Sequence, residues 1–176
     1  TPGPIFDDLC AAELDWKNVC VMASDERWVP EDSERSNARL IRNRLLTNRA
    51  ADASFLPFYM EGVDPDAAVG PLSEKVRDQC SLAVALLGMG ADMHTASLFP
   101  GVSGLREALS PEAPEVAVMR PDSQPEARIS LTAHVLDSAM AKHLVIFGEE
   151  KREALDRALT LPPEEAPIQS VLSECQ

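Results

Sequence analysis

Residues 82–101 read Leu-Ala-Val-Ala-Leu-Leu-Gly-Met-Gly-Ala-Asp-Met-His-Thr-Ala-Ser-Leu-Phe-Pro-Gly. The first six are apolar without alternation, which predicts a central strand of a parallel sheet, buried on both faces. Gly88 and Gly90 then turn the chain tightly and leave backbone N–H groups uncovered. Open α/β sheets bind their ligands at the carboxyl ends of parallel strands, so we expect the functional site in this loop.

The loop carries groups suited to an anion and to proton transfer. Uncovered amides in a glycine turn bind an anionic oxygen, a phosphate or a developing oxyanion. His94 adds an imidazole, the side chain that transfers protons near neutral pH. Two nucleotide-binding signatures are excluded, because Met93 occupies the third glycine position of a dinucleotide fingerprint and no Gly-Lys-Ser/Thr follows.

Composition restricts the partners of the chain. It has 176 residues, 45% hydrophobic and 26% charged, which suits one compact domain. A net charge of −13 argues against a nucleic-acid partner, which needs a basic face. No apolar run approaches the roughly 20 residues of a membrane span, so we expect no membrane partner. An anionic substrate needs a local cluster of arginines in so acidic a chain.

The cysteines indicate the compartment. They stand at positions 10, 20, 80 and 175, without a Cys-x-x-Cys pair, which argues against a zinc or thioredoxin-like site. Scattered cysteines in an acidic chain suit a reducing cytosol, so we expect a cytoplasmic protein without a bound metal. His134 and His143 have no motif around them, and we expect both to be structural.

Apolar periodicity predicts strands that alternate with helices. The expected strands cover 19–23, 82–87, 116–119, 129–131 and 143–147, and the expected helices cover 5–14, 38–45, 72–80, 103–109, 132–139 and a segment from 148. Residues 48–71 are expected to be a loop. The alternation predicts a single α/β domain over 1–176, Rossmann-like, doubly wound around a mainly parallel sheet with helices on both faces.

A second polar segment follows an expected strand, at residues 24–30, which read Ser-Asp-Glu-Arg-Trp-Val-Pro. Arg27 offers a planar fork for a phosphate, and Asp25 is suited to orient a base or to accept a hydrogen bond from a sugar hydroxyl. On the residues alone, an exposed Asp–Arg pair of little energetic worth is the favoured alternative.

Four separated motifs resemble those of the 6-phosphogluconolactonase family, in the family's order. They are Gly88–Gly101, with Met93 where the family usually has Gly; Asp25–Pro30; Arg128–Thr132 with Val135-Leu136; and Gly148–Leu155. The resemblance implies hydrolysis of the internal ester of 6-phospho-D-glucono-1,5-lactone in the oxidative pentose phosphate pathway, without a cofactor and with a sugar phosphate as substrate. The oligomer expected is a monomer or a homodimer.

The resemblance also implies roles for individual residues. His94 is the expected general base on water, with Asp25 as the second catalytic residue. The substrate and its phosphate are expected at Arg27, Arg128, Arg120, Thr1 and the amides of Gly88 and Gly90. A lysine common in the family falls near Ser123 and is missing here, and Arg120 is the candidate to replace it.

The start of the chain resembles the end of a family loop. Thr1-Pro2 matches the last residues of a Ser-Gly-Gly-Ser-Thr-Pro loop, so the resemblance implies that a βαβ portion of roughly 30 or more residues precedes this domain. Two alternatives stay open. One is an amino-sugar phosphate deaminase/isomerase of the same fold, which continues differently after the histidine. The other is a sugar-phosphate-sensing domain, which would work beside a basic helix-turn-helix module.

Overall fold

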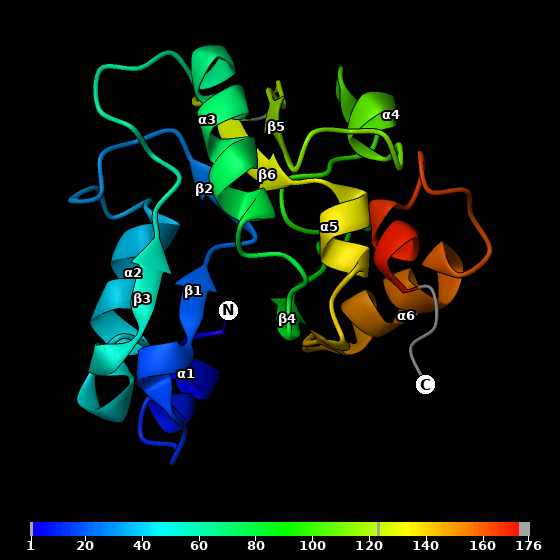
Figure 1. Ribbon diagram of the computed structural model, residues 1–176. Helices are drawn as coiled ribbons and strands as arrows, with labels where there is room; N and C mark the ends of the chain where they lie inside the picture. Colours follow the sequence, from blue (N-terminus) through cyan, green and yellow to red (C-terminus); the bar gives the residue numbers. More distant parts are fainter. Residues whose placement is uncertain (1, 123, 173–176) are drawn as a thin grey trace.

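The computed structural model describes residues 2–122 and 124–172 (Figure 1). Its strands are β1 (Cys20–Met22), β2 (Asp25–Arg27), β3 (Ser54–Leu56), β4 (Val84–Leu87), β5 (Val116–Met119), β6 (Arg128–Leu131) and β7 (Ala141–Leu144). Its α-helices are α1 (Gly3–Leu9), α2 (Asn37–Arg44), α3 (Pro65–Arg77), α4 (Leu105–Ala108), α5 (Ala133–Asp137) and α6 (Glu149–Ala158). The short 3-10 helices are η1 (Trp16–Asn18), η2 (Asn48–Asp52) and η3 (Pro167–Val171).

The strands form three small sheets. Strand β1 pairs with β3 and β4 pairs with β7, both in parallel, whereas β2, β6 and β5 form an antiparallel sheet in that order. The predicted α/β class, with helices around parallel strands, is confirmed. The antiparallel sheet was not predicted, and it brings the 25–27 segment against β6, more than one hundred residues later in the chain.

Two predicted elements are corrected. Residues 48–71 are not a loop, because they contain η2, β3 and the first half of α3, where Asp64 caps the helix by accepting from the N–H of Asp66 at 2.9 Å. Strand β4 is not buried on both faces: Ala85 and Leu87 are buried, but Val84 is 59% exposed. Among the described residues β4 pairs with β7 alone, so only one of its edges is covered.

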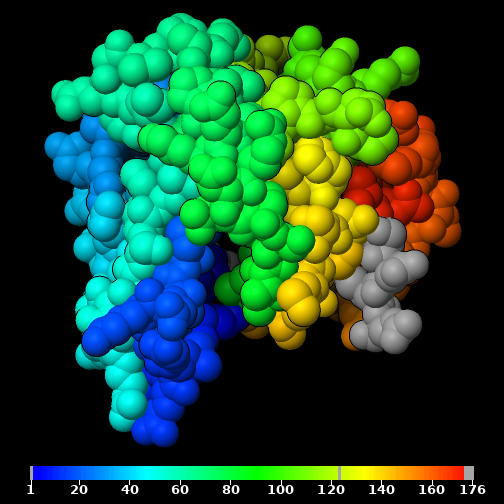
Figure 2. Space-filling model, viewed as in Figure 1, coloured from blue at the N-terminus to red at the C-terminus, as the bar shows by residue number. Residues whose placement is uncertain are grey.

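The apolar side chains form two cores. The larger core packs α3, β4, β5, β6, α5 and α6 together, and β6 lies deepest, since all four of its residues are buried. The smaller core joins α1, η1, α2 and η2 around Trp16 and Ile41. A small opening separates the blue N-terminal part from the green segment that carries β4 (Figure 2). Within the described residues, no helix has the length and apolar character needed to cross a membrane.

Candidate active site

The loop after β4 is closed by hydrogen bonds within itself. The Thr95 hydroxyl donates to the carbonyl of Gly88 at 2.9 Å, and the N–H of Gly90 donates to the carbonyl of His94 at 3.0 Å. The Gly90 amide is therefore engaged, which corrects the expectation that both glycine amides are uncovered. Gly88 is exposed, and a Cβ placed there would meet nothing within 4 Å.

His94 is held by a neighbouring carboxylate. Its Nδ1 lies 2.5 Å from Asp92 Oδ1, and its backbone N–H donates to the same oxygen at 3.3 Å. A carboxylate accepts, so Nδ1 carries the ring proton and Nε2 is left as the proton acceptor. The side chain of His94 is 31% exposed, so water can reach it. Asp92 was not among the predicted site residues, although its position two residues before the histidine is a usable signal.

Gly90 is required by the Asp92–His94 pair. A Cβ on Gly90 would lie 2.3 Å from both Asp92 Oδ1 and His94 Nδ1, far inside van der Waals contact. Only a residue without a side chain therefore allows the backbone to pass so close to the pair. The glycine of the sequence motif thus makes room for the imidazole, rather than offering a free amide.

Two arginines face each other on neighbouring strands. Arg27 on β2 is directly opposite Arg128 on β6 in the antiparallel register. Arg27 Nη1 donates to the carbonyl of Arg35 at 2.8 Å and to Asn37 Oδ1 at 3.0 Å, and Arg128 Nη2 donates to Gln124 Oε1 at 3.0 Å. The Nε atoms of both arginines are buried, and neither has a partner among the described residues. Unpaired buried donors beside two like charges are the arrangement that an anion would satisfy.

Arg128 is buried beside a second positive charge. Arg128 is 6% exposed, and its burial, together with the charge of Arg27, lowers the pKa of its guanidinium. The carboxylate of Asp25 opposes this shift from a distance of 3.6 Å between its Oδ2 and Arg128 Nη1. Arg128 is thus ion-paired with one carboxylate, Asp25, and has a second guanidinium, Arg27, opposite it on β2.

Asp25 connects the arginine pair to the histidine loop. Its Oδ2 accepts from the Ser97 hydroxyl at 2.7 Å, and its backbone carbonyl accepts from Asn37 Nδ2 at 2.8 Å. The N–H of Ser97 donates in turn to Ser130 Oγ at 3.1 Å. Ser97 is fully buried, so its two bonds tie the loop to β2 and β6. Among the described residues, Asp25 makes none of its contacts with His94.

Glu26 is a buried anchor that sequence analysis did not identify. Its carboxylate, 1% exposed, accepts from the N–H groups of Arg27, Asn37 and Ala38 and from the Ser36 hydroxyl, at 2.7–3.2 Å. Burial raises the pKa of Glu26, and the four donors act in the opposite direction. The N-terminus of a helix favours a negative charge, so Glu26 fixes β2 against α2 and holds Arg27 in place.

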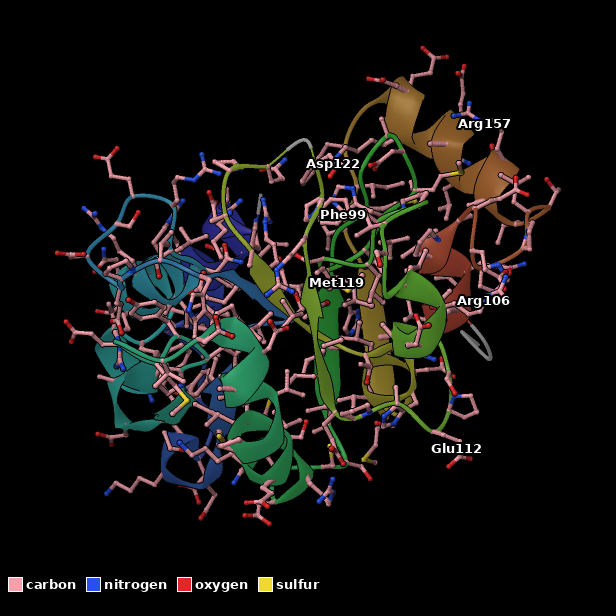
Figure 3. The ribbon with its side chains drawn as sticks, turned by 90° about the horizontal axis from the view of Figure 1, so that it is seen from above. Phe99, Arg106, Glu112, Met119, Asp122 and Arg157 are labelled. Carbon is pink, nitrogen blue, oxygen red and sulfur yellow. The ribbon has the colours of Figure 1, made fainter. Side chains whose placement is uncertain are left out.

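Phe99 joins the two halves of the site. Its ring lies 4.4 Å from the ring of His94, centroid to centroid, and the guanidinium carbon of Arg128 lies 5.8 Å from the Phe99 centroid. Phe99 is buried and is labelled in Figure 3, which looks onto this end of the molecule. The imidazole and the arginine pair therefore approach the same aromatic ring.

Comparisons with known proteins identify the family of the chain. The sequence model of the family described as glucosamine-6-phosphate isomerases/6-phosphogluconolactonase matches residues 1–176. The chain belongs to this family. It is 40% identical to the 6-phosphogluconolactonase of Rhizobium meliloti over 175 residues, which are 98% of this chain and 75% of that protein.

A second sequence relative and a solved structure show the same similarity. The 6-phosphogluconolactonase of Pseudomonas aeruginosa is 36% identical over 166 residues, covering 93% of this chain and 70% of that protein. The crystal structure of a 6-phosphogluconolactonase from Shewanella baltica superposes with a TM-score of 0.93 at 32% identity, covering 99% of this chain and 76% of that chain.

The departure from the family signature at Met93 has a structural meaning. Met93 has a φ of +66°, the left-handed region that glycine adopts without strain. Its carbonyl accepts from the N–H of Ile168 at 3.1 Å, which ties the loop to η3. A methionine thus holds a backbone conformation that glycine adopts more readily, and the loop stays closed around His94.

The remaining predicted site residues lie elsewhere. Arg120 points to α3, where its Nη1 and Nη2 donate to the two carboxylate oxygens of Asp66 at 3.1 and 2.6 Å. Thr1 and Ser123 lie outside the described residues. Within residues 2–122 and 124–172, no three His, Cys, Asp or Glu side chains cluster as metal ligands would.

Proposed function

We propose that this chain hydrolyses 6-phospho-D-glucono-1,5-lactone to 6-phosphogluconate in the oxidative pentose phosphate pathway. One observation carries the proposal: the imidazole of His94, bound to Asp92, and the arginine pair, which has unpaired Nε donors, both approach the ring of Phe99. It is supported by relatives named 6-phosphogluconolactonase at 36–40% identity. A substrate with a reactive carbonyl at one end and a phosphate at the other matches such a site.

The chemistry begins at His94. Its Nε2 takes a proton from water while the resulting hydroxide attacks the lactone carbonyl carbon. The ring C–O bond then breaks, and the same imidazole returns the proton to the leaving ring oxygen. Asp92 holds the Nδ1 proton and stabilises the imidazolium that forms between these steps. The exposed Gly88, with open space beside it, leaves room for the substrate at the carboxyl end of β4.

The phosphate binds away from the reacting bond. Arg27 and Arg128 hold it through their unpaired Nε donors, which fixes the position of the sugar ring relative to His94. Asp25 is a positioning residue in this scheme, because it bonds Ser97 of the histidine loop and lies beside Arg128. It thereby keeps the base and the phosphate site at a constant separation. Arg120 stays a candidate contact only if it leaves Asp66 on substrate binding.

The proposal extends to the location and the oligomeric state of the enzyme. A cytoplasmic location, expected from the scattered cysteines, is consistent with free thiols at Cys10, Cys20 and Cys80. We also propose that the enzyme acts as a monomer or a homodimer.

The test is an assay on freshly prepared 6-phospho-D-glucono-1,5-lactone, with spontaneous ring opening subtracted. The proposal requires saturable hydrolysis and a marked preference over unphosphorylated gluconolactone. Release of ammonia from glucosamine 6-phosphate, without lactone hydrolysis, would instead indicate the deaminase/isomerase branch of the family.

A further inference from the structure

An ion pair borders the arginine pair and has no part in the proposed reaction. Arg35, in the turn before α2, donates from Nε and Nη2 to Glu126 Oε1 at 3.0 and 2.6 Å. Within the part of the chain that the structure describes, Arg35 engages this one carboxylate oxygen and no other. The Glu126 side chain is 14% exposed, whereas the Arg35 side chain is 49% exposed. The arginine is therefore free to move on its solvent side, while the carboxylate is enclosed by the protein.

Both partners are anchored beside the phosphate site by their backbones. The carbonyl of Arg35 accepts a hydrogen bond from Arg27 Nη1 at 2.8 Å. The backbone of Arg35 is therefore in direct contact with the side chain of Arg27. Glu126 precedes Arg128 by two residues, and the intervening Ala127 accepts from the N–H of Trp28 at 2.9 Å. The ion pair thus joins the turn before α2 to the segment before β6, beside the two strands that carry Arg27 and Arg128.

The guanidiniums at this point act on one another. Burial is the main cause that lowers the pKa of Arg128, and the charges of Arg27 and Arg35 lower it further. Asp25 and Glu126 oppose that shift. A phosphate monoester carries close to two negative charges at neutral pH and three strong acceptor oxygens, so it is a better partner for Arg35 than one carboxylate oxygen.

We propose that Arg35 is a third phosphate-binding residue, and that Glu126 is the internal carboxylate which it leaves when the substrate's phosphate arrives. The inference rests on the proposed function, because it concerns the same phosphate. Glu126 then acts as a competitor that weakens phosphate binding in the resting enzyme.

Opposite effects are expected from the two partners. Arg35→Gln removes a charge-assisted contact to the phosphate, so KM for the phosphorylated lactone should rise at least about fivefold, with kcat changed little. Glu126→Gln removes the competing charge, so KM should fall and inorganic phosphate should inhibit at about two- to threefold lower concentration. If the ion pair only stabilised the two loops, Arg35→Gln and Glu126→Gln would lower stability and phosphate binding alike.

The matched controls are Arg49→Gln and Glu13→Gln. Arg49 Nη2 and Glu13 Oε1 form another exposed ion pair, at 3.0 Å, between η2 and the segment after α1. These variants make the same changes of charge outside the phosphate site, and we expect wild-type KM and phosphate inhibition. Thermal melting of all four variants excludes unfolding as the cause.

The experiment measures KM and kcat on the phosphorylated lactone and, separately, binding of inorganic phosphate by calorimetry. The inference is overturned if Arg35→Gln behaves as Arg49→Gln does, or if Glu126→Gln weakens phosphate binding. Failure of the proposed function looks different: the wild type would not hydrolyse the lactone, yet its phosphate binding would still depend on Arg35 and Glu126 in opposite directions.

Discussion

Gly90→Ala changes the proposed catalytic pair without altering either of its members. The added Cβ would lie 2.3 Å from His94 Nδ1 and from Asp92 Oδ1, whereas ordinary contacts begin near 3.4 Å. The pair must therefore move by about 1 Å, and a misplacement of that size costs about 100-fold in rate. The backbone itself should tolerate alanine, because Gly90 is not among the residues with positive φ. We expect kcat to fall about 100-fold, within the ~10²–10⁴-fold that general base catalysis supplies.

The assay is the initial rate of lactone hydrolysis, with binding of 6-phosphogluconate measured in parallel. Product binding should stay within about threefold of wild type, because Arg27 and Arg128 are untouched. Gly70→Ala on α3 is the control, since a Cβ there meets nothing within 4 Å and the position is remote from the loop. Unchanged hydrolysis by a folded Gly90→Ala protein would refute the claim that the Asp92–His94 geometry matters.

Three further predictions concern the phosphate, the pH dependence of stability and metals. Arg27→Ala should lower kcat/KM for the phosphorylated lactone roughly 30-fold, which corresponds to about 2 kcal/mol of transition-state binding, and should change kcat/KM for gluconolactone little. Equal losses on both substrates would make Arg27 purely structural. Arg77 donates to both oxygens of Glu115 and lowers the pKa of that carboxyl below 4.5, so the melting temperature should fall as pH drops below that value. Arg77→Gln should reduce this fall of the melting temperature at low pH, and melting curves between pH 3 and 7 check it. Dialysis against EDTA should leave activity intact, and inhibition reversed by one divalent ion would contradict this.

The histidine loop could be predicted because its information is local. A run of apolar residues, two glycines and a histidine lie within one short segment, and the structure places His94 directly after β4 as expected. The number of strands that pair with a given strand, in contrast, cannot be inferred from the residues of that strand alone. The same apolar run suggested a strand buried on both faces, but Val84 is 59% exposed, and among the described residues β4 pairs with β7 alone.

The phosphate site depends on a pairing that no local pattern contains. Asp25–Arg27 has low strand propensity and resembled a loop, yet pairing with the buried β6 makes it a strand. Only that register places Arg27 opposite Arg128. Glu26 was missed for the same reason, since its donors come from the N-terminus of α2 and not from its sequence neighbours alone. The first half of α3, residues 65–71, was missed because Pro65 and Pro71 suggested a loop, although Pro65 stands at the first helical position, where proline is tolerated.

The most direct test of the central claim replaces His94 itself. His94→Gln keeps a polar side chain of similar length but removes the proton acceptor at Nε2, so catalysed hydrolysis should fall about 10²–10⁴-fold. Binding of 6-phosphogluconate should change little, because the arginine pair holds the phosphate. His143→Gln, at an exposed position of β7, is the control and should retain the wild-type rate. A folded His94→Gln protein that binds the product and hydrolyses the lactone at the wild-type rate would contradict the account.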